Sequence, residues 1–153
     1  MTELEFIVDQ LKLAYVGEAW HGPAVMEILD DIDAEAAAAH PIRAGHSIWE
    51  LVLHIAAWER VITKRIQGET TTLSDDENFG HVSRTNEAAW RDAVQTLRTS
   101  HDELIRTAAG LDPARLSERV PGKDYDIRFM LTGAVQHAAY HGGQIALLKR
   151  ARS

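Results

Sequence analysis

The sequence contains no cysteine, and this absence restricts its chemistry more than any other feature of its composition. Without thiols the chain cannot form disulfides, use a protein thiolate as a nucleophile or bind a metal through sulfur. Any metal ion must therefore be held by histidine, aspartate, glutamate or amide side chains.

Long apolar runs and an excess of positive charge are also missing. Charged residues interrupt each apolar stretch before it reaches the roughly 18 residues of a membrane span, and the N-terminal segment MTELEFIVDQ is acidic, unlike a secretory leader. We therefore expect a cytoplasmic protein. The formal net charge of −7 disfavours non-specific binding to nucleic acids or anionic membranes, because neither rewards an acidic surface. The expected partners are a small molecule and a second copy of the chain.

The pattern that is present is helical. Apolar residues recur at helical spacing along most of the chain, and no segment alternates as a strand does. The 153 residues, of which 45% are apolar, suffice for one domain with its own core, covering 1–153. Four long amphipathic helices predict an all-α fold, a four-helix bundle. Their expected positions are about Glu3 to Val16, Ser47 to Gly68, Arg84 to Ala109 and Ile127 to Arg150.

Shorter elements are expected between these helices. Pro23 introduces the helical stretch AVMEILDDI, and DAEAAAAHPI is a short turn that Pro41 ends. Ser47, followed three residues later by Glu50, matches the capping box of a helix start. The polar, acidic stretch at 68–83 predicts a long loop, and a loop of this length is more often functional than a mere connection. We therefore expect it to border the mouth of the site.

Histidines stand on apolar stripes of two of the expected helices. In AVQHAAYHGGQ, the residues His137, His141 and Gln144 share one face of the last helix. His54 lies among apolar residues in LVLHIAAW, where the usual alternative is a hydrogen-bonded core histidine. Burying neighbouring imidazoles is costly unless each finds a partner, and a metal ion provides one. One ligand from one helix and two from another therefore predict a three-histidine metal site in the bundle.

Residues next to the histidines are candidates for supporting roles. Gln144 is placed to orient a metal-bound ligand, with an amide bonded to a neighbouring helix as the alternative. Glu50, one turn before His54, is a candidate general base or orienting partner of His54, with the capping role as the alternative. Trp58 and Tyr140 are expected to wall the pocket rather than to react.

Rival motifs are weaker. A di-iron site needs paired Glu-x-x-His motifs, and only Glu18 to His21 fits that pattern. The dipeptide His101-Asp102 resembles a phosphohydrolase motif but is expected to be solvated surface. Glu59, turned about 140° away from His54, is expected to serve helix packing.

Three segments carry a resemblance to a known family: AWHGPAVMEIL, HSIWELVLHIAAWE and HAAYHGGQIALLK. In this order and at these separations they resemble the DinB-like family of metal-binding four-helix bundles, including its YfiT-type and bacterial thiol transferase branches. The resemblance implies that the metal ligands of the family fall on His54, His137 and His141. Trp20 and His21 also match a family segment, with capping or packing as the alternative role for His21. The resemblance further implies a homodimer.

The ligand type and the family together suggest the chemistry. Imidazole ligands suit zinc or nickel, with iron and manganese as alternatives. Three neutral imidazoles leave a divalent ion open positions and its full charge, so it can lower the pKa of bound water toward about 7 or activate a low-molecular-weight thiol. The expected reactions are hydrolysis of a small molecule and transfer of a diffusible thiol to a small electrophile. The alternative is a bundle that binds a metal or a ligand without catalysis.

Overall fold

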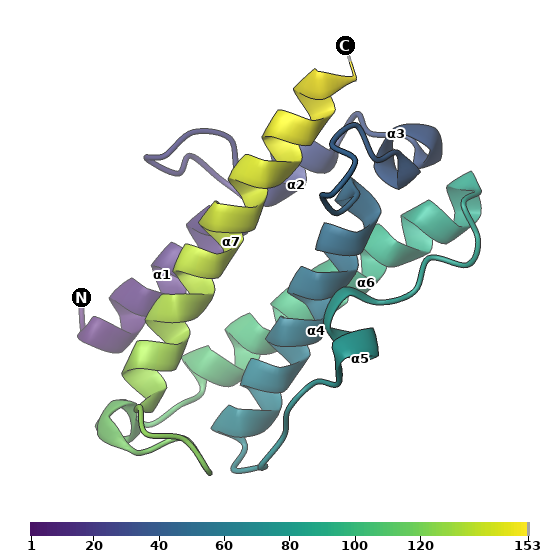
Figure 1. Cartoon of the computed structure of the whole chain (residues 1–153). Coiled ribbons are helices and arrows are strands. Elements are labelled where there is room, and N and C mark those ends of the chain that lie inside the picture. Colours follow the sequence, from purple (N-terminus) through teal and green to yellow (C-terminus); the bar gives the residue numbers. More distant parts are fainter. Residues whose placement is uncertain (153) are drawn as a thin grey trace.

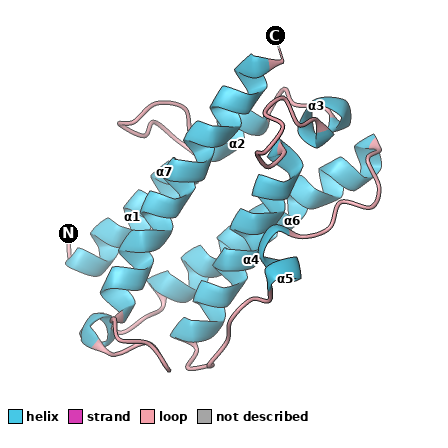
Figure 2. Ribbon diagram, in the orientation of Figure 1, coloured by secondary structure: helices cyan, strands magenta, loops and turns pink. Residues whose placement is uncertain are grey.

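The computed structural model describes residues 1–152, and every regular element within them is a helix (Figures 1 and 2). The bundle consists of four long helices, α1 (Glu3–Tyr15), α4 (Ile48–Ile66), α6 (Glu87–Ala109) and α7 (Ile127–Ala151). Between them lie α2 (Val25–Leu29), α3 (Ala34–Ala38), α5 (Asp75–Phe79) and the 3-10 turn η1 (Pro113–Ser117). Both α1 and α4 pack against α6 and α7, which confirms the predicted all-α four-helix bundle. In the described part of the chain, no helix combines the length and the apolar character that crossing a bilayer requires.

Side-chain caps set the helix starts. The Ser47 hydroxyl accepts a hydrogen bond from the Glu50 backbone N–H at 3.1 Å, and the Glu50 carboxylate accepts one from the Ser47 N–H at 2.6 Å. The predicted capping box is therefore confirmed. Gly68, with φ +93°, follows the end of α4 as expected. The start of α6 was predicted too early at Arg84, because Asn86 supplies the capping oxygen and its own backbone is extended.

The prediction of an uninterrupted polar loop between α4 and α6 is wrong. Part of this segment forms α5, which starts with its own capping box between Ser74 and Glu77. Gly80 ends α5 at φ +61°, and a Cβ at this position would lie 2.9 Å from Cδ1 of Leu53. Glycine therefore allows the chain to approach α4 closely, and α5 lies beside α4 (Figure 1).

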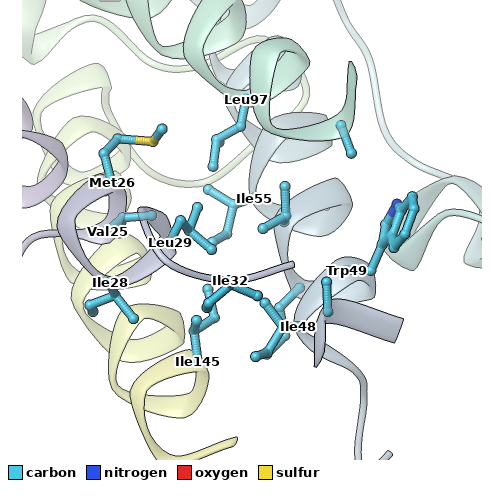
Figure 3. Packing of buried hydrophobic residues seen from close by; sticks show 14 of the residues in the cluster. Val25, Met26, Ile28, Leu29, Ile32, Ile48, Trp49, Ile55, Leu97 and Ile145 are labelled. Atoms are coloured by element: carbon cyan, nitrogen blue, oxygen red, sulfur yellow. The ribbon is translucent and has the colours of Figure 1, made fainter. Parts of the chain in front are cut away.

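Two apolar clusters fill the bundle. The first joins α2 and α3 to the four long helices. Figure 3 shows seven of its side chains pointing toward one another: Val25, Ile28, Leu29, Ile48, Ile55, Leu97 and Ile145. The second cluster includes Leu11 of α1, Leu104 of α6 and Leu131 of α7. Along α7 the second cluster ends at Ala134 and the first begins at Ala138. The candidate metal ligands stand at this level, where one cluster gives way to the other.

Candidate metal centre

His54 of α4 converges with His137 and His141 of α7. Nε2 of His137 lies 3.0 Å from Nε2 of His54 and 3.1 Å from Nε2 of His141. One ring nitrogen from each residue lies within 4.8 Å of the other two. His54 and His141 are buried and His137 is partly buried. The four-residue spacing places two of the rings on one face of α7, and the packing of α4 on α7 brings the third to them.

The hydrogen bonds that His54 and His141 donate show which ring nitrogen carries the proton. Nδ1–H of His54 donates to the backbone carbonyl of Asn78 at 2.7 Å, and Nδ1–H of His141 donates to Oε1 of Gln144 at 2.6 Å. A neutral imidazole has one N–H, so Nε2 of both rings carries a lone pair. Nε2 of His137 faces both of these lone pairs, and its single proton cannot satisfy both fully. A bound cation would satisfy all three nitrogens, so the donor set fits a divalent metal ion.

Burial keeps the three imidazoles neutral. Desolvation lowers the pKa of His54 and of His141 below the ordinary histidine value. The pKa of His137 falls further, to about 3, because of desolvation and then because of the neighbouring His141 and His54 rings. A metal ion binds the neutral form of histidine, so protons compete little for this site near neutral pH.

We expect the metal-free protein to lose stability as the pH falls from about 7.5 to about 5. Histidines of the unfolded chain take up protons near pH 6.5, whereas folded His137 has a pKa of about 3. Between these pH values the unfolded state binds more protons than the folded state. The free energy of unfolding therefore decreases as the pH decreases. Urea denaturation at both pH values measures this loss. The same pair of measurements on His137→Gln should show a smaller loss, and an undiminished loss would contradict the assignment to His137.

The α5 segment covers His54. The Phe79 ring stacks on the His54 ring with centroids 4.2 Å apart, and it also stacks on the His46 ring at 3.6 Å. The Trp58 indole N–H donates to Oδ1 of Asn78 at 2.8 Å. The segment that was expected to border the site therefore does so. It also supplies the carbonyl that orients His54, a contact that the sequence reasoning missed.

The structure supports the capping alternative for Glu50. Its carboxylate accepts the Ser47 backbone hydrogen bond and lies 3.1 Å from Nε2 of His40. Although partial burial raises the pKa of Glu50, hydrogen bonds from Ser47 and His40 bring it below the ordinary value. Asn78, not Glu50, is the hydrogen-bond partner of Nδ1 of His54. The candidate role of Glu50 as a general base stays a prediction.

The other predicted site residues differ in their placement. Gln144 contacts His141 directly, as the hydrogen bond to Nδ1 shows. The Tyr140 ring lies 5.0 Å from the His141 ring, but 66% of Tyr140 is exposed, so this residue borders the site from the solvent side. His21 is exposed and does not belong to the histidine cluster, and Trp20 is fully exposed beside it.

A pocket of about 420 Å³ opens beside the histidine cluster. His54 and His137 line it, so the cluster is accessible from the pocket. Trp58 forms part of the wall, as predicted, together with Tyr125 and Phe129. The arrangement gives a metal-binding cluster an adjoining space for a small molecule.

The expectation that His101 is solvated surface is wrong. His101 and Glu59 are 7% and 3% exposed, and Nδ1 of His101 lies 3.0 Å from Oε1 of Glu59. The His101 ring stacks on Tyr15 with centroids 3.7 Å apart. Burial raises the pKa of Glu59, and the hydrogen bond with His101 opposes that change. Glu59 therefore serves the packing of α4 on α6, as predicted, and takes no part in the three-histidine cluster.

Comparison with protein families gives a match over most of the chain. Residues 19–145 match the family model described as the DinB superfamily. The match includes all three histidines of the cluster. No curated protein and no solved structure matches the chain.

Proposed function

The chain belongs to the DinB superfamily, and from this premise we propose that it is a metal-dependent enzyme that acts on a small molecule. His54, His137 and His141 would hold a divalent ion, with zinc or nickel preferred by imidazole ligands. The observation that carries the proposal is the convergence of three neutral imidazole nitrogens beside an open pocket. A histidine cluster that served packing alone would be expected to satisfy its nitrogens with ordinary hydrogen bonds.

The reaction we propose is transfer of a low-molecular-weight thiol to a small electrophile, or hydrolysis of a small molecule. A divalent ion in such a site supplies Lewis acidity, which lowers the pKa of a water or thiol ligand. Asn78 and Gln144 hold two of the imidazoles in the orientation that leaves Nε2 free. Phe79 and Trp58 provide aromatic walls that limit the access of water to His54. Because the chain has no cysteine, a transferred thiol must diffuse in.

Metal analysis of protein purified without a histidine tag, followed by an activity screen, tests this function. We expect about one divalent ion per chain and turnover of a thiol with an electrophile, or of an amide or ester. Turnover should disappear after chelation and return when the ion is restored. Turnover that persists in metal-free protein would contradict the proposal. Bound metal without turnover across a broad screen would favour a bundle that binds a metal or ligand without catalysis.

A further inference from the structure

Arg65 is a buried cation that has no acidic partner among the described residues. Only 4% of the residue is exposed. Its Nε and Nη2 atoms donate to the backbone carbonyl of Thr71 at 3.1 and 2.8 Å, and Nη1 donates to the Tyr125 hydroxyl at 3.0 Å. Its guanidinium carbon lies 5.7 Å from the centroid of the Trp58 ring. Across residues 1–152, no carboxylate lies within ion-pair distance of this guanidinium.

The partners of Arg65 leave part of its charge uncompensated. A buried charge is costly unless a group of opposite sign offsets it. Arg65 lies in the last turn of α4, where the helix end carries only about half of a negative charge. The face of Trp58 adds a weak attraction. Of the five N–H donors of a guanidinium, two remain unused here, one on each terminal nitrogen. The chain therefore offers an unmatched positive charge and donors for an anion.

The unmatched charge faces the pocket beside the histidines. Arg65, His54 and His137 all line this pocket, and none of the acidic side chains that the structure describes lines it, although the whole chain has a net charge of −7. Arg65 follows His54 by eleven positions on α4, which corresponds to about 16 Å along the helix axis. Long helical side chains lean toward the N-terminus, so the guanidinium reaches back toward His54. Between the two ends the wall is apolar, with Ile62 and Met130.

We infer that this pocket binds a small carboxylate with an apolar or aromatic body, whose carboxylate contacts Arg65 and Tyr125 and whose other end lies at the histidines. The inference rests on the proposed function and adds the class of substrate. The Tyr125 hydroxyl accepts a hydrogen bond from Arg65 and keeps its own proton to donate. A carboxylate there would neutralise the charge and take two-point contacts from the guanidinium. The apolar walls would bury the body of the molecule.

A comparison of an acid with its amide tests the inference without any variant. Metal-free protein is titrated with 3-phenylpropionate and with 3-phenylpropanamide, and binding is followed by NMR. We expect the acid to bind at least about 10-fold more tightly, because only the acid carries a negative charge that can offset the Arg65 guanidinium. Equal affinities would overturn the inference. In metal-free protein no metal can bind the acid directly. Absence of bound metal would therefore count against the proposed function, whereas equal binding of acid and amide would count against this inference.

Three variants test whether the two probes bind in this pocket. Arg65→Met should remove the preference for the acid. Gly133→Leu should block both probes, because Gly133 lines the pocket and a leucine side chain there would fill part of it. The substitution should be tolerated, because a Cβ at this position would meet no atom within 4 Å. Arg115→Met is the matched control, because Arg115 also donates to a backbone carbonyl, that of Ile66, but pairs with Glu118 and does not line the pocket. It should bind both probes as the unmodified protein does.

The variants also separate binding from folding. If Arg65→Met unfolds at a lower temperature but keeps the preference for the acid, Arg65 serves structure alone and the inference is wrong. If Arg65→Met does not fold, the comparison of acid with amide in the unmodified protein and in Gly133→Leu decides. Retained acid binding in Gly133→Leu would place the site elsewhere and overturn the inference.

Discussion

His141→Ala should abolish metal binding and all metal-dependent turnover, whereas Gln144→Ala should keep the metal. Removing one of three imidazole ligands takes away part of the anchor itself. Gln144 instead accepts the hydrogen bond that orients His141, and loss of such a partner typically costs about 10- to 100-fold in affinity or rate. Metal content after dialysis, competitive titration with a chelator and turnover of the two variants measure the difference.

A histidine outside the cluster provides the control for these variants. His40 contacts Glu50 and does not belong to the three-histidine cluster, so His40→Ala should bind metal as the unmodified protein does. Undiminished turnover in metal-free His141→Ala would rule out a metal-dependent reaction. Equal loss of metal from His40→Ala and His141→Ala would contradict the ligand assignment.

His101→Leu should lower the free energy of unfolding by about 2 kcal/mol, within the range for leaving a buried hydrogen-bonding group without its partner. The substitution leaves the Glu59 carboxyl group buried without its partner at Oε1. Oε2 of Glu59 already lacks a hydrogen-bond partner among the described residues. Urea denaturation of the metal-free protein near neutral pH measures the loss.

The double variant with Glu59→Met and His101→Leu should recover most of this stability. Replacing both members of a buried pair by apolar side chains of similar volume is often neutral or stabilising. Metal affinity should remain unchanged in the double variant, because neither residue belongs to the histidine cluster. A His101→Leu variant as stable as the unmodified protein would show that the pair contributes nothing to folding.

The predictions that succeeded rest on local periodicity. The spacing of His137 and His141 places both rings on one face of any helix that contains them. His54 follows the same apolar stripe that packs α4 into the bundle. The capping box at Ser47 and Glu50 is likewise a pattern within four residues. Such features can be predicted from local spacing alone, because the apolar faces of the helices pack against one another in the core.

One missed feature arises from a contact between distant segments, and two others had local signals that were not used. The carbonyl of Asn78 orients His54, and a backbone carbonyl leaves no signature in the sequence. The capping-box pattern between Ser74 and Glu77 was the one local signal for α5. His101 did carry a signal, because it follows Leu97 by four residues and so falls on the buried face of α6. The basic residues near it in the sequence suggested solvated surface, although His101 itself is buried.

X-ray absorption spectroscopy of tag-free protein, measured at the edge of the bound metal, tests the central claim most directly. The account predicts a divalent ion with three imidazole nitrogens, at about 2.0 to 2.1 Å if the ion is zinc. The His137→Ala variant should lose this signal together with the metal. A protein that retains no divalent metal, or a metal surrounded by oxygen ligands without imidazole, would contradict the account.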